Sequence, residues 1–137
     1  LAEQKKLVWA DIVVLQFPMH WYNMPSILSR WFEITFKHGF SHGSTGNKLL
    51  GKKLIISLTS GTPEENYRID GKVGHEIFEY LLPILSTARL CKMDFVDYVY
   101  TGGMALPNKD DISKKDLVIQ KSVIHAKRVI NLLSSLI

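Results

Sequence analysis

The chain has 137 residues, 46% of them hydrophobic and 22% charged, which is enough for one domain with a single sizeable core. The net charge of +4 comes from scattered lysines and arginines, so we expect a solvated surface and no nucleic-acid partner. No apolar run approaches the roughly 20 residues of a membrane helix, and no signal peptide is recognisable, so we expect no transmembrane segment. The single cysteine, Cys91, excludes an internal disulfide and favours the reducing cytoplasm; we expect it to be a buried apolar side chain.

The first ten residues predict a short helix whose Leu7 and Trp9 contact the core. The run from Asp11 to Phe17 is apolar and rich in β-branched residues, which predicts a buried strand. Pro25 suits the first turn of a helix, because no partner is needed there for an N–H. We therefore predict a helix from Pro25 to about Lys37, with a broad apolar face.

A second buried strand is predicted over Lys53–Thr59, and a loop of small and hydroxyl residues follows it up to Tyr67. Glycine and small side chains directly after a strand let backbone N–H groups approach a ligand closely. The next helix is predicted from Gly71 to Ala88 with Pro83 inside it. Since proline removes a backbone hydrogen bond, we expect a kink there.

The third strand is predicted over Phe95–Tyr100 and ends at the glycine pair Gly102–Gly103. The last helix is predicted to begin at Ser113, with Asp116 completing an acidic capping box. Its apolar residues recur every three or four positions, and we expect this stripe to pack in the core: Ile119, Val123, Ala126, Ile130, Leu133 and Ile137.

Strands and helices thus alternate along the chain, which predicts an α/β fold: one domain, residues 1–137, with three parallel strands in chain order and helices on both faces. Right-handed crossovers bring the carboxyl ends of parallel strands to one edge, so the loops after the three strands should be neighbours. Open α/β sheets bind their ligands at that edge.

The residues in these loops favour binding of a flat ring. The sequence has no Gly-x-Gly-x-x-Gly, phosphate-binding loop or nucleophile elbow, and its histidines lack zinc-type spacing, so we expect no metal site. Trp21 and Tyr22 offer apolar surface with a polar handle, Thr59–Gly61 offer hydrogen-bond donors, and Tyr67 offers a phenol. An isoalloxazine needs this combination. Taken singly, Trp21 and Tyr22 are more often core or interface aromatics, and Thr59–Gly61 more often form a plain turn. The combination of these residues is what favours the ring site.

The segment from Gln16 to Pro25, Gln-Phe-Pro-Met-His-Trp-Tyr-Asn-Met-Pro, resembles the Gln-Phe-Pro-x-x-Trp-Tyr/Phe-x-x-Pro motif of the NAD(P)H:quinone oxidoreductase family. That family is flavodoxin-like and includes the ancillary oxidoreductases of glutathione-gated potassium efflux systems. Residues His38–Gly43 are similar to its Gly-Phe-Ala-Tyr-Gly segment, and Thr59–Thr62 with Tyr67 to its Thr-Thr-Gly-Gly…Tyr loop. The resemblance covers nearly all of the chain.

The resemblance implies a flavin site, with FMN or FAD as cofactor and NAD(P)H as co-substrate. Tyr67 would stabilise negative charge on the reduced flavin and is the implied catalytic residue. Sites of this family lie at a homodimer interface, so Phe40 and His42 would approach the ring bound to a partner subunit. The implied cofactor-binding residues are Pro18, Met19, His20, Trp21, Tyr22, Thr59, Ser60, Gly61 and Tyr67. The implied acceptor pocket is formed by Trp21, Tyr22, Phe40 and His42.

Three features depart from the family pattern. Thr62 replaces the second glycine of the Thr-Thr-Gly-Gly loop, and Val73 stands where some members carry a histidine. The family also has an N-terminal part, holding its first strand, phosphate-binding loop, first helix and second strand, before the point where this sequence starts. We expect those N-terminal strands to be missing here, which would leave the strand at Ile12 with an unpaired edge.

The resemblance predicts a flavin-dependent NAD(P)H:quinone oxidoreductase. NAD(P)H would deliver hydride to the flavin and leave, and a quinone would then take it from the same face in a ping-pong cycle. One alternative is a truncated, non-catalytic dimerisation or regulatory module, which the missing N-terminal part favours. Another is an ancillary subunit of a potassium efflux system, which would bind a membrane channel.

Overall fold

The computed structural model describes residues 1–106, 108 and 110–137. Its three parallel strands form one sheet in the order β1-β2-β3. The strands are β1 (Ile12–Pro18), β2 (Lys53–Thr59) and β3 (Asp94–Thr101). The helices are α1 (Ala2–Trp9), α2 (Ser26–Thr35), α3 (Leu82–Leu90) and α4 (Ile112–Ser134), with short 3-10 helices η1 (Glu64–Asn66) and η2 (Ile77–Leu81).

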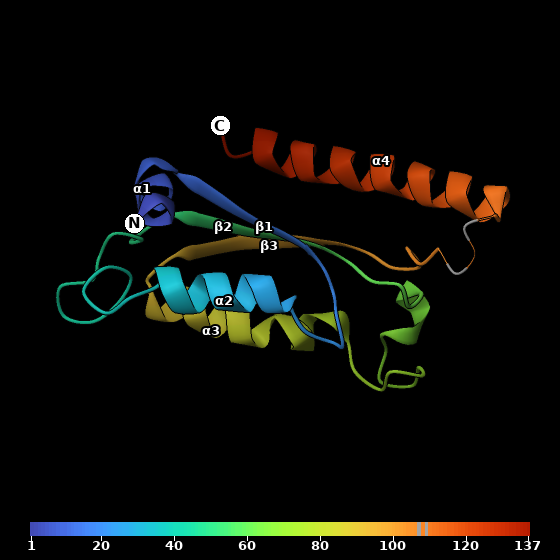
Figure 1. Cartoon of the computed structure of the whole chain (residues 1–137), viewed down its shortest axis with the longest axis horizontal. Helices are drawn as coiled ribbons and strands as arrows, with labels where there is room; N and C mark the ends of the chain where they lie inside the picture. The colour runs from blue at the N-terminus through green and yellow to red at the C-terminus, as the bar shows by residue number, and fades with distance from the viewer. Residues whose placement is uncertain (107, 109) are drawn as a thin grey trace.

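The helices lie on both faces of the sheet. Figure 1 shows α2 and α3 on one face, α4 on the other, and α1 beside the amino ends of the strands. The predicted α/β fold with a chain-order parallel sheet is confirmed.

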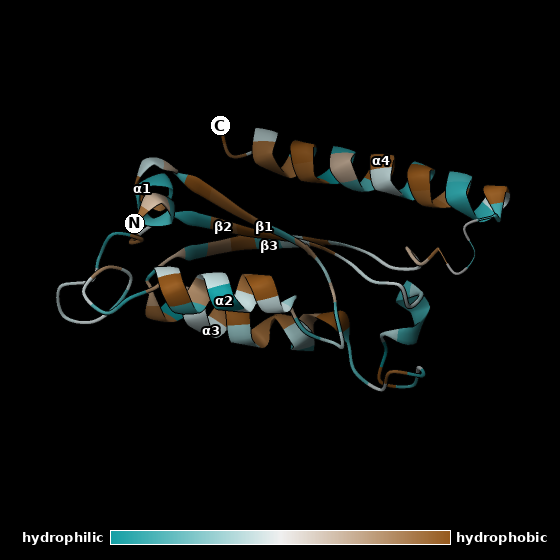
Figure 2. Cartoon of the chain, in the orientation of Figure 1, coloured by the Kyte–Doolittle hydropathy of each residue, from teal (hydrophilic) through white to brown (hydrophobic). Residues whose placement is uncertain are grey.

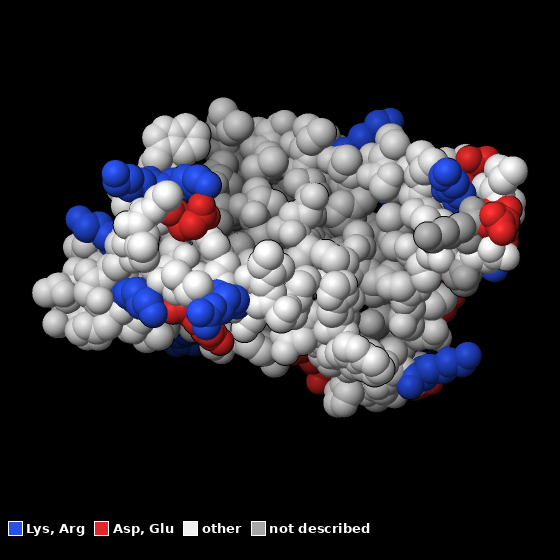
Figure 3. Space-filling view, viewed as in Figure 1, with Lys and Arg blue, Asp and Glu red and all other residues white. Residues whose placement is uncertain are grey.

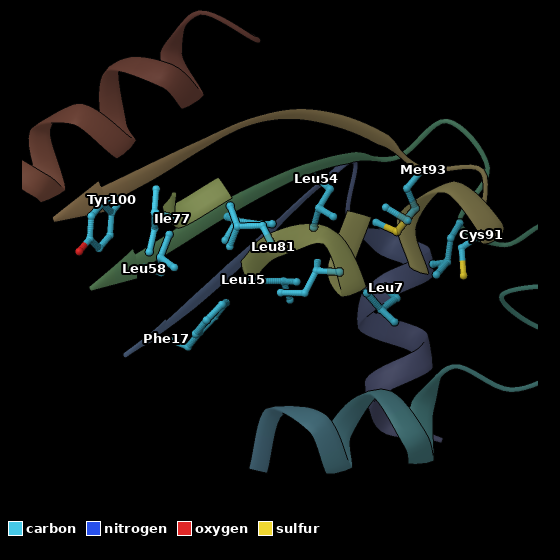
Figure 4. Close-up of a cluster of buried hydrophobic side chains, with 14 of the residues drawn as sticks. Leu7, Leu15, Phe17, Leu54, Leu58, Ile77, Leu81, Cys91, Met93 and Tyr100 are labelled. Atoms are coloured by element: carbon cyan, nitrogen blue, oxygen red, sulfur yellow. The ribbon is translucent and has the colours of Figure 1, made fainter. Parts of the chain in front are cut away.

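The main core lies between the sheet and the two helices, α2 and α3, that cover one of its faces (Figure 4). Along β2, Leu54, Ile56 and Leu58 alternate toward this face and are at most 3% exposed. Burying each such side chain stabilises the fold by about 1.5–3 kcal/mol. Cys91 is 2% exposed beside Met93, so its predicted burial is confirmed, and burial raises the pKa of its thiol. A thiol of this kind is inert as a nucleophile.

A buried histidine ties the sheet to α4. His125 is 7% exposed, with its Nε2 2.8 Å from Ser57 Oγ on β2 and its Nδ1 2.7 Å from Thr101 Oγ1 on β3. Because Ser57 Oγ also donates to Gln16 Oε1, it accepts from Nε2–H, and Nδ1 accepts from Thr101. Burial and then the nearby Arg128 guanidinium lower the pKa of His125, which favours this neutral form.

The predicted helix from Gly71 to Ala88 is wrong at its start. Helical structure begins at Ile77 as η2 and continues as α3, and Pro83 lies in the first turn of α3, where it causes no kink. The glycines explain the late start. A Cβ on Gly71 would lie 2.6 Å from the Asn66 carbonyl oxygen, and Gly74 has a φ of +78°.

Two predictions about helix faces and ends are also wrong. Leu7 is buried as expected, but Trp9 is 86% exposed, because residues two apart on a helix face different directions. The last helix begins at Ile112 rather than Ser113, and the side chain of Asp111, not Asp116, caps it by accepting from the Lys114 N–H.

The apolar stripe of α4 does not pack in the core. Ile119, Val123 and Ile130 are 52%, 48% and 58% exposed, and the buried residues of α4 are His125 and Val129 instead. Figure 2 shows hydrophobic residues at intervals along α4. The reason is that, within the described residues, no second helix covers the α4 side of β1, so the stripe has no element to pack against.

The charged side chains form no single patch on the face shown in Figure 3, where Lys and Arg lie in small groups with Asp and Glu among them. None of the helices in the described part of the chain combines the length and apolar character that crossing a bilayer requires.

Candidate functional site

The loops after the three strands are joined by backbone hydrogen bonds. Met19 N–H donates to the Thr59 carbonyl at 2.7 Å, and Ser60 N–H donates to the Thr101 carbonyl at 3.1 Å. Gly103 N–H in turn donates to the Thr62 carbonyl at 2.9 Å. The predicted convergence of these loops at the carboxyl edge of the sheet is therefore confirmed.

Trp21 and Tyr22 form the tip of a tight hairpin directly after β1. His20 and Asn23 exchange two backbone hydrogen bonds, of 2.8 and 3.0 Å, and Trp21 and Tyr22 have φ values of 49° and 61°. Two-residue turns with positive φ at both positions are usually Asn-Gly, because bulky residues are strained there. The turn leaves Trp21 92% exposed. Strain of this kind is typical of functional sites.

The hairpin tip and the loop after β2 line an open cavity of about 190 Å³. Its apolar walls come from the hairpin side, and its polar groups come from the loop. The lining residues are Met19, Trp21, Tyr22, Ser60, Gly61, Thr62 and Tyr67.

The loop after β2 brings two backbone N–H groups to residues that line this cavity. Among residues 1–106, 108 and 110–137, no acceptor is recorded for the N–H groups of Gly61 and Thr62. The hydroxyl of Ser60 is engaged, since it donates to the Thr62 carbonyl at 2.7 Å and accepts from the Tyr100 hydroxyl at 2.6 Å. Ser60 therefore fixes the shape of the loop, and the two N–H groups are the donors available to a ligand.

Tyr67 adds a phenol to the same cavity. Its ring is 7% exposed, and its hydroxyl donates to the Met19 thioether sulfur at 3.3 Å. Burial raises the pKa of Tyr67, so the phenol is a neutral donor at physiological pH. Because a thioether is a weak acceptor, a ligand oxygen or nitrogen can displace it at little energetic cost.

Tyr100, near the end of β3, holds the Ser60 side chain in place through a hydrogen bond. Burial raises the pKa of Tyr100 to about 12, so its hydroxyl stays protonated and donates to Ser60. A Cβ at Gly102 would lie 2.7 Å from the Tyr100 hydroxyl and 2.5 Å from the Glu64 nitrogen. Glycine at this position thus allows the loops after β2 and β3 to touch.

Most of the implied cofactor-binding residues meet in the cavity: Met19, Trp21, Tyr22, Ser60, Gly61 and Tyr67. Pro18 and Thr59 lie at the ends of their strands and line a neighbouring cavity of about 320 Å³, together with Ser57 and His125. His20 is exposed at the base of the hairpin and is not among the lining residues of the 190 Å³ cavity.

Phe40 and His42 do not join this cavity. They lie in the loop between α2 and β2, at the amino edge of the sheet and opposite the hairpin (Figure 1). Within one chain, the implied acceptor pocket of Trp21, Tyr22, Phe40 and His42 is therefore not assembled.

Two further residues, Thr62 and Tyr80, belong to the site in the structure. Thr62 lines the cavity. Its position directly after Gly61, in the loop that follows β2, was the sequence signal that could have identified it. Tyr80 has its ring centroid 5.6 Å from Tyr22 and 5.9 Å from Tyr67. No sequence pattern points to Tyr80, because the turn that returns it to the site depends on the glycines between residues 71 and 74.

Comparison with curated proteins finds oxidoreductases. The chain is 37% identical over 94 residues to the uncharacterized NAD(P)H oxidoreductase YdeQ of Bacillus subtilis (strain 168), covering 69% of this chain and 48% of that protein. It is also 37% identical to the glutathione-regulated potassium-efflux system ancillary protein KefG of Cronobacter sakazakii, covering 69% of this chain and 51% of that protein. The chain thus spans about half the length of these curated relatives.

Comparison with solved structures agrees with the fold. The general stress protein 14 of Treponema denticola, solved in complex with FMN, superposes with a TM-score of 0.80 at 28% identity. The match covers 96% of this chain and 71% of that one. A family profile described as the flavodoxin-like fold matches residues 1–123. The chain therefore belongs to the flavodoxin-like family, together with proteins named as NAD(P)H oxidoreductases.

Proposed function

We propose that this chain forms the ring-binding part of a flavin-dependent NAD(P)H:acceptor oxidoreductase. The observation that carries the proposal is the cavity lined by a strained aromatic hairpin, by the Gly61–Thr62 backbone and by the buried phenol of Tyr67. The N–H groups of Gly61 and Thr62 have no acceptor in the described part of the chain. An apolar wall opposite convergent donors suits a flat ring with a polar edge. The similarity to YdeQ and to a protein solved with FMN supports the same proposal.

The residues present fit a flavin. Met19, Trp21 and Tyr22 would lie against the faces of the ring, and the N–H groups of Gly61 and Thr62 would donate to its polar edge. Tyr67, a neutral donor, would stabilise negative charge that develops on that edge. A flavin bound there supplies the hydride-transfer chemistry, and the protein supplies binding, orientation and electrostatics.

We propose FMN as the cofactor, since the Treponema protein was solved with FMN. The cavity would contact only the ring, which FAD shares, so FAD is the alternative. NAD(P)H is proposed as the reductant because YdeQ is named for it. A cavity of about 190 Å³ is smaller than the roughly 300–1,000 Å³ of most ligand pockets, so reductant and acceptor would use one exposed ring face in turn. This favours a ping-pong cycle with a quinone as acceptor.

We further propose a homodimer in which Phe40 and His42 reach the partner's site. The two residues lie at the opposite edge of the sheet from Trp21, so an antiparallel twofold arrangement would place them over the partner's hairpin. They would then complete the small cavity as the acceptor pocket. The cytoplasm is the proposed compartment, because the one cysteine is free and buried.

Two alternative functions stay open. One is a non-catalytic dimerisation or regulatory module that binds no flavin. The similarity to KefG favours an ancillary subunit of a potassium efflux system that binds a membrane channel.

The test is the visible absorption spectrum of the purified chain after addition of FMN and desalting. We expect a retained flavin band that bleaches with NAD(P)H. Tyr67→Phe should weaken binding of oxidised FMN by about fivefold, the value of one net hydrogen bond of about 1 kcal/mol. Tyr98→Phe, which removes a phenol outside the cavity, should leave it unchanged. A colourless chain would refute flavin binding and favour the non-catalytic module.

A further inference from the structure

Tyr80 lies between the hairpin tip and the phenol of the candidate site. Its ring centroid is 5.6 Å from Tyr22 at an interplanar angle of 31°, and 5.9 Å from Tyr67 at 85°. Offset and edge-to-face pairs at these separations are the favourable aromatic geometries. The side chain is half-buried on η2, so it contacts both parts of the site from a different element.

The hairpin tip needs a packing contact such as the one between Tyr22 and Tyr80 to hold its strained turn. Trp21 and Tyr22 hold left-handed backbone angles, and strained turns persist only where surrounding structure holds them. The two hydrogen bonds between His20 and Asn23 close the turn, but they do not set its direction relative to the cavity. Within the described residues, the ring contact recorded for the hairpin tip is the pair Tyr22–Tyr80.

The position of Tyr80 is itself well defined. It lies in η2, whose start is closed by a capping box between Glu76 and Glu79. The next residue, Leu81, is 1% exposed in the core. The ring of Tyr80 is therefore carried by an anchored element, whereas the hairpin is carried by a two-residue turn.

We propose that Tyr80 is a positioning residue for the ring-binding site. By packing on Tyr22 and Tyr67 at once, it holds the aromatic wall at a fixed distance from the phenol donor. The identity of the ring ligand rests on the function proposed above, but the positioning of the hairpin does not.

The first measurement needs no ligand. Amide order parameters of Trp21 and Tyr22, from ¹⁵N relaxation of the full chain, should fall from about 0.85 to below about 0.6 in Tyr80→Leu. Tyr80→Phe keeps the ring and should preserve them. The matched control is Phe78→Leu, which removes an aromatic ring from the same 3-10 helix, where it pairs with Tyr98 instead.

Three results bear on the positioning claim. Unchanged order parameters in Tyr80→Leu would overturn it, and so would an equal loss in Phe78→Leu. If Tyr80→Leu does not fold, Tyr22→Leu removes the same ring pair from the exposed side, and the amide of Trp21 should then loosen. A rigid Trp21 in that variant would overturn the proposal.

The second measurement is an FMN titration followed by flavin fluorescence. Tyr80→Leu should raise the Kd by about tenfold, whereas Tyr80→Phe and Phe78→Leu should stay within about twofold of the wild type. A loosened hairpin with an unchanged Kd would overturn the role of Tyr80 at the site. If the wild type takes up no FMN, the proposed function fails, and the order parameters alone decide the positioning of the hairpin.

Discussion

Trp21 and Tyr22 stand at the two most strained positions of the candidate site. A non-glycine residue in the left-handed region costs about 1–2 kcal/mol, and both residues are there. Trp21 is 92% exposed, so burial of its ring does not offset this cost within the chain. The stability of the fold therefore does not explain the pair, whereas display of two rings to a ligand does.

Replacing the pair by the residues that the turn prefers should separate stability from binding. Trp21→Asn with Tyr22→Gly would relieve about 2 kcal/mol of strain and lose about 1 kcal/mol from the Tyr22–Tyr80 pair. We therefore expect the double variant to be more stable by about 1 kcal/mol in urea unfolding. FMN affinity should fall by at least about tenfold, because the aromatic wall is lost.

The control for this experiment is Trp9→Asn, which removes another exposed tryptophan far from the cavity. It should leave FMN affinity unchanged. A double variant that is less stable than the wild type would show that the turn is not strained, and one that keeps full FMN affinity would show that the hairpin is not a wall of the site.

Among the elements, α4 shows the limit of reading a helix face from its periodicity. The repeat of three and four residues correctly identifies an amphipathic helix, but it does not say what covers the apolar stripe. In the structure, the residues that contact the sheet include His125, a polar residue held by Ser57 and Thr101. The predicted stripe lies beside them and is exposed.

Two adjacent residues on α4 test this assignment. Val129 is 8% exposed and Ile130 is 58% exposed. Val129→Ala removes two buried methyl groups and should lower the free energy of unfolding by about 2 kcal/mol. Ile130→Ala should change it by less than about 0.5 kcal/mol, because an exposed side chain loses little burial and alanine favours the helix. Urea unfolding of this chain measures both, and a larger loss for Ile130→Ala would place the predicted stripe in the core after all.

For the whole molecule, local sequence patterns were sufficient to predict the position of a residue wherever that residue lies in a strand or in the loop directly after it. The apolar runs at β1 and β2 and the right-handed crossover rule predict the shared edge, and Met19, Trp21, Gly61 and Tyr67 meet there. Contacts made by distant segments were not predictable. Tyr80 returns to the site through a glycine-rich turn, and Pro18 and Thr59 end on the neighbouring cavity because strand pairing, not the motif, sets their direction.

The placement of Phe40 and His42 leads to a prediction about two copies of the chain. If each site takes its hairpin from one protomer and these two residues from the other, a twofold dimer contains two equivalent composite sites. Trp21→Ala should disable the hairpin that a protomer supplies to its own site. Phe40→Leu with His42→Ala should disable the pair that it supplies to the partner's site. Each variant alone should therefore bind FMN weakly. In a mixed dimer both defects fall in the same site, and the second site is entirely wild type.

Co-refolding the two variants in equal amounts should thus restore binding in about a quarter of the sites, since about half of the dimers are mixed and each has one intact site. Flavin retained after desalting measures the restored fraction. Mixing Trp21→Ala with Trp21→Ala/Tyr22→Ala is the matched control, because no dimer of these two variants contains an intact hairpin. Restoration in the first mixture alone requires a site shared between protomers. Full FMN binding by Phe40→Leu with His42→Ala alone would mean that these two residues have no part in the pocket. If both variants bind weakly alone and neither mixture restores binding, the site is not shared between protomers.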